Sequence, residues 1–323
     1  MKKIAVFTSG GDSSGMNACI RAVVRTAIYN NIQVFGIKRG YDGLIKGEVE
    51  ELFSHSVANI LQRGGTILKS ARSDDFRTKE GRKKAFETIK KYEIDGLIGI
   101  GGDGTFTGAN TFNQEYNVPF IGVPGTIDND LYGTDSTIGY DTALNTVIDA
   151  VDKIRDTASS HNRLFFIEVM GKDAGFIALR SGIATGAEAI LVPETKTYIN
   201  KLIAKLEAGR RKSKTSGIVI VAEGDDTGGA FEIAKKVKEK FDYYDTRVSI
   251  LGHLQRGGKP SAKDRVLASQ LGFSAVENLL KGETNQMVGI VNNQLVLTAF
   301  DKAIKYNKNL DSNLLKLVDV LSI

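Results

Sequence analysis

Short apolar segments recur along this chain, and each is followed by glycines and then by a longer helical pattern. The segments are continuous apolar runs rather than alternating ones, which indicates strands that are buried on both faces. Repeated strand–helix units of this kind predict an α/β fold with a mainly parallel sheet. The expected strands are 4–9, 32–38, 96–102, 120–125, 164–171, 189–194, 217–224, 247–253 and 287–291, and the expected helices include 16–30, 80–92, 142–156 and 262–282.

Composition excludes several classes of protein. The 323 residues are 41% hydrophobic and carry a net charge of +5, which is typical of a globular chain large enough for two domains. No membrane-length apolar run and no basic block interleaved with aromatic residues occurs, so we expect neither a membrane nor a nucleic acid as partner. The first residues lack a signal-length apolar region. The single cysteine, Cys19, cannot form an intrachain disulfide and is expected to be buried on the first helix, so we expect a cytoplasmic protein.

Polar and glycine-rich motifs follow the predicted strands. Ligands of parallel α/β sheets bind beyond the carboxyl ends of the strands. Glycines, acids and bases are therefore expected to meet along one edge. The motifs are SGGD at 9–12, KRGYDG at 38–43, GGDG at 101–104, PGTIDND at 124–130, MGK at 170–172, AEG at 222–224 and GHLQRGG at 252–258.

Two of these motifs, SGGDSSGMNA and IGGDGTFTGA, share one design: a strand ends, glycines turn the backbone, and a helix begins. Free N–H groups at such a helix start favour phosphate oxygens. The alternative is that both are merely tight turns. No Walker A loop occurs. Gly99, Gly101 and Gly104 match the letters of the dinucleotide fingerprint, but the next strand ends in glycine and proline instead of an acid, which leaves NAD as the second choice.

The acids in these motifs favour metal-assisted phosphate chemistry. Asp103, between glycines, would repel phosphates unless a cation such as Mg²⁺ intervened, and it could also cap a helix. PGTIDND fails as a calcium loop because Tyr132 and Gly139 stand at ligand positions. Thr126 or Asp128 could cap the next segment, but an acid on this edge could also take the proton of a substrate hydroxyl.

Together these motifs resemble bacterial ATP-dependent 6-phosphofructokinases. SGGDSSGMNA, GGDGT, PGTIDND, SSHNR, EVMG and GHLQRGG carry the resemblance, in the same order and spacing, from Met1 to Ile323. The resemblance implies two three-layer α/β domains. The ATP-binding domain would comprise 1–138 plus about 252–302, and the sugar-phosphate-binding domain 139–251 plus about 303–323. The implied reaction transfers the γ-phosphoryl group of ATP to the 1-hydroxyl of fructose 6-phosphate, giving fructose 1,6-bisphosphate in glycolysis.

The resemblance also implies site residues. ATP would be held by Gly11, Arg72, Ser73, Gly102, Asp103, Gly104 and Thr105, with Mg²⁺ at Asp103. Asp128 would be the catalytic base, with Thr126, Asp130 and Lys172 beside the reaction. The sugar phosphate would be held by Thr126, Ile127, Asp128, Arg163, Met170, Gly171, Lys172, Glu223, Arg247, His253, Leu254, Gln255 and Arg256. Arg163 and Arg247 would come from a neighbouring subunit of a homotetramer.

The resemblance further implies allosteric control by ADP and phosphoenolpyruvate. The residues that match the effector pocket are Arg21, Ala22, Val23, Val24, Arg25, Arg155, Gly186, Ala187, Glu188, Lys212 and Lys214, although 210–214 could equally be a solvated basic face.

The chain departs from the family pattern at three positions. Ser54 replaces a common arginine, which puts the effector response in doubt. Lys172 replaces an arginine and keeps its charge without the planar fork. Ser14 replaces a proline, which we expect to loosen the first loop. Glycine at 104 and 125 favours ATP over pyrophosphate, because pyrophosphate-using relatives typically carry Asp and Lys there.

Overall fold

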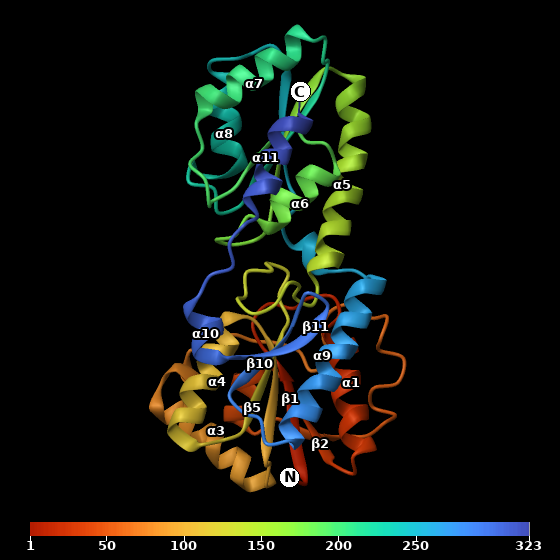
Figure 1. Ribbon diagram of the computed structural model, residues 1–323, viewed down its shortest axis with the longest axis vertical. Helices are drawn as coiled ribbons and strands as arrows, with labels where there is room; N and C mark the ends of the chain where they lie inside the picture. Colours follow the sequence, from red (N-terminus) through yellow and green to blue (C-terminus); the bar gives the residue numbers. More distant parts are fainter. Residues whose placement is uncertain (323) are drawn as a thin grey trace. The chain divides into compact units, whose positions relative to one another are not determined.

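A computed structural model describes residues 1–322 of the chain, which form two compact units (Figure 1). Unit 1 comprises Met1–Ile127, Leu131–Thr142 and Arg256–Lys308. Unit 2 comprises Asp128–Asp130, Ala143–Gln255 and the C-terminal segment from Asn309. Both units are thus assembled from segments that are distant in sequence. No helix within residues 1–322 is long and apolar enough to cross a membrane.

Unit 1 contains a seven-stranded sheet in the order β11-β10-β5-β4-β1-β2-β3. Its interior pairs are parallel, and the edge strands β3 and β11 are antiparallel to their neighbours. The elements are β1 (Lys3–Thr8), α1 (Met16–Tyr29), β2 (Gln33–Ile37), α2 (Gly40–Lys46), β3 (Val49–Leu52), the 3₁₀ helix η1 (Asp75–Arg77), α3 (Lys79–Tyr92), β4 (Gly96–Gly101), α4 (Asp103–Tyr116), β5 (Phe120–Pro124), α9 (Ala262–Leu280), β10 (Gln286–Val291), β11 (Gln294–Ala299) and α10 (Phe300–Lys305).

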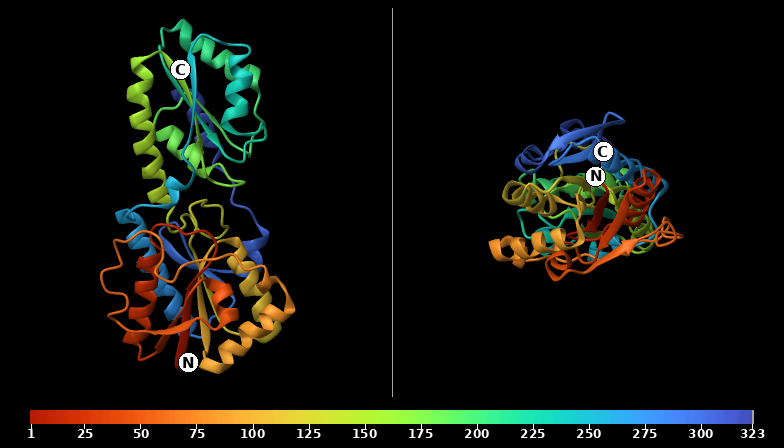
Figure 2. Two further views of the ribbon diagram at one scale, coloured as in Figure 1. Left: turned by 180° about the vertical axis from the view of Figure 1, so that it is seen from behind. Right: turned by 90° about the horizontal axis from the view of Figure 1, so that it is seen from below.

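Successive residues of β1 show why unit 1 has three layers. Ile4 and Val6 pack in one apolar cluster with α1 and α9, whereas Ala5 and Phe7 pack in a second cluster with α2, α4 and α10. Side chains alternate between the two faces of a strand, so a continuous apolar run fills both clusters. Figure 2 shows the same helices from behind and from below.

Unit 2 contains a four-stranded sheet in the order β7-β8-β6-β9, in which all pairs are parallel. Alternate residues of β6 and β8, such as Leu164 and Val219, pack against α7 and α8. The elements are α5 (Tyr140–Ser160), which begins within unit 1, β6 (Arg163–Val169), α6 (Phe176–Ala184), β7 (Ala189–Leu191), α7 (Ile199–Arg211), β8 (Gly217–Ala222), α8 (Gly229–Lys238), β9 (Asp245–Ile250), the 3₁₀ helix η2 (Gly252–Arg256) and α11 (Ser312–Leu321).

The predicted α/β class with mainly parallel sheets is confirmed, and all nine expected strands are present. Two strands were not expected, β3 and β11. Both are antiparallel edge strands whose side chains are mostly exposed or half-buried, so neither reads as a continuous apolar run.

Candidate functional site

The first glycine loop, residues 9–15, connects β1 to α1. Gly10 and Gly15 have φ of +81° and +120°, a region that favours glycine. Gly15 is the N-cap of α1 and supplies no side-chain bond, which leaves N–H groups of the first turn available to an anion. A Cβ built at Gly11 would lie 2.4 Å from Nη1 of Arg256. The guanidinium of Arg256 therefore lies directly against this loop.

The second glycine loop connects β4 to α4. Gly102, the N-cap of α4, is extended and forms no side-chain cap, and Asp103 stands exposed in the first turn. A Cβ built at Gly104 would have no described atom within 4 Å, so this side of the loop is open. The second loop therefore offers uncapped N–H groups, one exposed carboxylate and space for a ligand.

Asp103 fits a Mg²⁺ site in which the protein supplies few of the metal ligands. Within residues 1–322, no group of three or more His, Cys, Asp and Glu side chains could by itself hold a metal ion. Magnesium commonly uses one or two carboxylates and takes its other ligands from water and substrate phosphates. An exposed carboxylate beside a helix start without a side-chain cap suits that mode.

Tyr41 of α2 connects two of the predicted ATP-binding segments, but the sequence did not single it out as a site residue. Its Oη donates a 2.6 Å hydrogen bond to the carbonyl of Thr105, and its ring stacks on Phe76 at 3.9 Å. The N–H of Phe76 in turn donates to Oγ of Ser73 at 3.3 Å. Burial raises the pKa of the Tyr41 phenol well above its usual range, so the group remains a donor. Its motif, KRGYDG, was expected at the ligand-binding edge because it follows a predicted strand.

The PGTIDND turn follows β5. The N–H of Gly125 donates to the carbonyl of Gly101 at 2.9 Å, and Oγ1 of Thr137 donates to the carbonyl of Thr126 at 2.6 Å. Asn129, between Asp128 and Asp130, adopts a φ of +55°, in the left-handed region. The turn thus follows a strand neighbouring the one before the GGDG loop.

Gly125 is needed for packing against the core, whereas the sequence suggested that it makes room for a nucleotide. A Cβ at this position would lie 2.9 Å from Cγ2 of Ile100 and 3.2 Å from Cε of Met16, both core side chains. Of the two glycines expected to make room for a nucleotide, only Gly104 faces open space.

Five of the predicted sugar-phosphate residues meet in unit 2, beyond the carboxyl ends of its strands: Met170, Gly171, Lys172, Glu223 and Gln255. Oε1 of Glu223 accepts hydrogen bonds from the backbone N–H groups of Gly171 and Lys172, at 3.3 and 2.7 Å. Oε1 of the buried Gln255 accepts from the N–H of Met170 at 3.1 Å. Lys172 has a φ of +55°, a strained conformation for a non-glycine residue. Its exposed ammonium lies 3.4 Å from Asp173.

Five other predicted residues make different contacts or are exposed. Arg163 and Arg247 both form ion pairs with Asp245, at 3.2 and 2.8 Å, near the amino ends of β6 and β9. His253 and Leu254, in η2, are exposed. Arg256 belongs to unit 1, where it contacts Gly11.

The predicted effector residues fall into two sets. On α1 of unit 1, burial and the neighbouring Arg25 lower the pKa of Arg21, while Val23 and Val24 are core side chains that leave only their backbone to a ligand. Ala22 also lies on α1, half-buried.

The second set lies in unit 2. Nη2 of Arg155 donates to the carbonyls of Thr185 and Gly186, and Nζ of Lys214 pairs with Glu188 at 2.8 Å. Ala187 is buried and Lys212 is exposed. The side chains of Arg155, Glu188 and Lys214 are therefore already bonded to protein groups.

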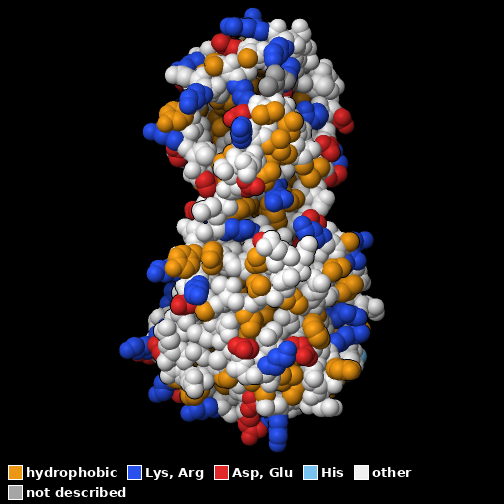
Figure 3. Space-filling model, in the orientation of Figure 1, with side chains coloured by type: hydrophobic (Ala, Val, Ile, Leu, Met, Phe, Trp, Pro, Cys, Tyr) orange, Lys and Arg blue, Asp and Glu red, His pale blue; other side chains and the backbone are white. Residues whose placement is uncertain are grey.

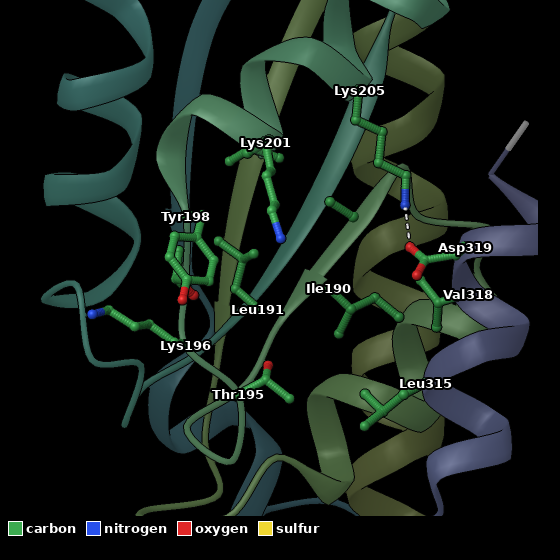
Figure 4. Close-up of a pocket in the computed structure, with 13 residues that line it drawn as sticks. Ile190, Leu191, Thr195, Lys196, Tyr198, Lys201, Lys205, Leu315, Val318 and Asp319 are labelled. Atoms are coloured by element: carbon green, nitrogen blue, oxygen red, sulfur yellow. Dashed lines mark hydrogen bonds and ion pairs between the residues drawn. The ribbon is translucent and has the colours of Figure 1, made fainter.

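A cavity of about 330 Å³ lies elsewhere in unit 2, between β7, α7 and α11 (Figure 4). None of its thirteen lining residues belongs to a predicted site. Its lysines already have partners: Lys205 pairs with Asp319 at 3.0 Å, and Lys196 and Lys201 lie over the ring of Tyr198.

Comparison with known proteins places the chain in one family. The family model described as Phosphofructokinase matches residues 3–279. The ATP-dependent 6-phosphofructokinase 2 of Bacteroides thetaiotaomicron is 57% identical over 323 residues, which is 100% of this chain and 99% of that protein. The ATP-dependent 6-phosphofructokinase 1 of Thermus thermophilus is 54% identical over the whole of both chains.

A solved structure, the phosphofructokinase of Saccharomyces cerevisiae, superposes with a TM-score of 0.90 at 39% identity and covers 94% of this chain and 45% of that one. Family model, relatives and structure agree, and the chain belongs to the phosphofructokinase family.

Proposed function

We propose that the protein transfers the γ-phosphoryl group of ATP to the 1-hydroxyl of fructose 6-phosphate, giving fructose 1,6-bisphosphate. The observation that carries this is the second glycine loop, where uncapped N–H groups, the exposed Asp103 and the open side of Gly104 lie together at the start of α4. The relatives of similar length and above 50% identity are named ATP-dependent 6-phosphofructokinases, which supports both substrates.

Unit 1 would bind the nucleotide. The helix starts of α1 and α4 direct N–H groups and their positive dipole ends at phosphate oxygens. Mg²⁺ held at Asp103 would neutralise charge on the transferred group. Tyr41 holds the backbone of Thr105 near the segment of Arg72 and Ser73, through its hydrogen bond to Thr105 and its stacking on Phe76. Phosphoryl transfer depends mostly on positioning and charge neutralisation, which this set of residues supplies.

Unit 2 would bind the sugar phosphate. Glu223 orders the backbone of Gly171 and Lys172, and the ammonium of Lys172 supplies positive charge to an anionic substrate. Asp128 would accept the proton of the attacking hydroxyl, and Thr126 and Asp130 would orient the reactants. Arg163 and Arg247 would serve the site of a neighbouring subunit in a homotetramer. Their place at the amino end of β6, away from Met170, supports this arrangement.

Regulation and location are part of the same proposal. Arg155, Glu188 and Lys214 would bind ADP or phosphoenolpyruvate after exchanging their present partners. Ser54 removes one phosphate contact. A single buried cysteine suits the cytoplasm. On the face that Figure 3 shows, basic and acidic side chains are interspersed, which gives no support to nucleic-acid binding.

A donor panel tests the reaction. Purified protein with fructose 6-phosphate and Mg²⁺ should form fructose 1,6-bisphosphate with ATP and not with pyrophosphate. Asp128→Ser should lower kcat by at least about 10²-fold, the lower range for loss of a general base. Full turnover in that variant would refute the role of Asp128. Reduction of a substrate by NADH without ATP would instead support the oxidoreductase alternative.

A further inference from the structure

Ser14 contacts a turn that lies far away in sequence. Its Oγ lies 2.8 Å from the carbonyl oxygen of Gly258, 3.2 Å from that of Gly257 and 3.5 Å from that of Arg256. A hydroxyl has one proton, so it donates one strong bond at a time, here to Gly258 as the nearest oxygen. Ser14 is only 2% exposed, so water cannot readily replace the bond. Contrary to the expected loosening, serine at this position ties the first loop to the 256–258 turn.

The turn that Ser14 holds carries Arg256. Nη1 of Arg256 donates to the carbonyl of Asp12 at 3.3 Å and lies where a side chain at Gly11 would have to be. The guanidinium is thus located by backbone groups of the first glycine loop. Its position depends on how the 256–258 turn packs on that loop. Ser14, which belongs to the loop, bonds directly to this turn.

The turn also has a support that does not depend on Ser14. A Cβ built at Gly64 would lie 2.2 Å from the carbonyl oxygen of Gly258, so the backbones of the two segments are in close contact. Asn17 holds the 63–67 segment, because its side chain donates to the carbonyls of Arg63 and Gly64 and accepts from the N–H of Ile67. Loss of the Ser14 hydroxyl should therefore shift the turn without unfolding it.

We infer that Ser14 is a positioning residue, which acts on the substrate phosphate through Arg256 by fixing the 256–258 turn against the first glycine loop. The inference rests on the proposed function and on the sugar-phosphate contact that the family resemblance implies for Arg256. Removing one hydrogen bond of this kind should raise the KM for fructose 6-phosphate by about three- to tenfold. The KM for ATP and the melting temperature should change little.

The neighbouring serine supplies a matched control. Ser13 is fully buried like Ser14, but its Oγ has no hydrogen-bond partner among the described residues. Ser14→Ala should raise the KM for fructose 6-phosphate, Ser13→Ala should leave it unchanged, and Ser14→Thr should restore it because threonine keeps the donor. Equal behaviour of Ser14→Ala and Ser13→Ala would overturn the inference.

A double-mutant cycle separates positioning from a merely structural role. In an Arg256→Ala background, Ser14→Ala should alter kcat/KM for the sugar by less than about twofold, because Ser14 acts through the missing guanidinium. Measuring kcat/KM at low sugar concentration keeps the weak variants within range. A full additional loss in that background, or a lowered melting temperature with an unchanged KM, would contradict the inference. If the wild-type protein fails to phosphorylate fructose 6-phosphate, the proposed function itself is refuted.

Discussion

Glu115→Gln is expected to lower the free energy of unfolding by about 2 kcal/mol, because it breaks a half-buried, two-pronged ion pair. Nε and Nη2 of Arg82 donate to the two carboxylate oxygens of Glu115 at 2.6 and 2.7 Å. Nη1 donates to the carbonyls of Phe76 and Arg77 at 3.0 and 2.8 Å. Arg82 thereby ties α3 to α4 and to η1, the segment just after the predicted ATP contacts Arg72 and Ser73.

The magnitude follows from the geometry. Glutamine keeps one oxygen that can accept from the guanidinium, but its amide N–H₂ would face the other donor. One charge-assisted bond is lost, which costs about 1.5–3 kcal/mol. The Glu115 side chain is 26% exposed, so water can partly replace it, and the lower half of that range is expected. Against a typical total of about 5–15 kcal/mol, the change should be plain in urea unfolding at fixed protein concentration.

Glu93→Gln is the matched control. Nζ of Lys3 lies 2.6 Å from Glu93, as close as Arg82 lies to Glu115, but the Glu93 side chain is 77% exposed. We therefore expect no resolvable change in the urea midpoint. Equal shifts in the two variants would show that burial does not set the strength of these pairs.

The effect of Glu115→Gln on stability should depend on pH. Arg82 lowers the pKa of the Glu115 carboxyl below its usual range. A lowered pKa means that the stabilisation is complete above the ordinary glutamate pKa, about 4.3, and is lost as the pH falls through the folded value. The difference between wild type and Glu115→Gln should therefore be full at neutral pH and shrink in acid. A constant difference from neutral pH to below the folded pKa would refute the reasoning.

Three further predictions address other groups. Gly104→Asp should raise the KM for ATP about fivefold or more, because a carboxylate would face the phosphates, while Gly104→Ala should leave it nearly unchanged; equal values would refute the proposed phosphate position. Asp264→Asn should destabilise the protein by about 2 kcal/mol, because the buried carboxylate accepts from the N–H groups of Gly139 and Thr142 and from the Thr142 hydroxyl. Burial raises the pKa of Asp264 despite these bonds. The difference in unfolding free energy between wild type and Asp264→Asn should therefore shrink as the pH rises through the folded pKa. A difference that grows with pH would contradict this prediction. Burial also raises the pKa of Cys19, and iodoacetamide should label it only after unfolding; rapid labelling of native protein would contradict its burial.

The parallel core was predictable from sequence because burial on both faces leaves a continuous apolar run. The two missed strands lack that property. A local signal for β11 was nevertheless present: Asn292 and Asn293 have positive φ, and the register pairs Val291 with Gln294 across them. Consecutive asparagines between strand-like segments are typical of a two-residue hairpin, so the turn could have been read.

The glycine loops of the candidate site were predictable because strand, glycine and helix start lie next to one another in sequence. The supporting contacts were not. Tyr41 reaches Thr105, and Ser14 reaches Gly258, across long stretches of sequence. A tyrosine or a serine does not indicate by its type that it has such a distant partner. Arg256 likewise shows its place on Gly11 only when the two motifs are brought together in space.

The discontinuity of unit 1 has a consequence for synthesis on the ribosome. β5 gains its second neighbour, β10, only when Gln286–Val291 has emerged, and α9 must arrive before the apolar face of α1 is covered. The strands of unit 2 are all translated in that interval. A nascent chain therefore completes the unit 2 sheet while one edge of the larger sheet is still bare. Such an exposed edge is a template for wrong strand pairing. The nascent chain with this incomplete sheet is therefore the intermediate that a chaperone would have to protect.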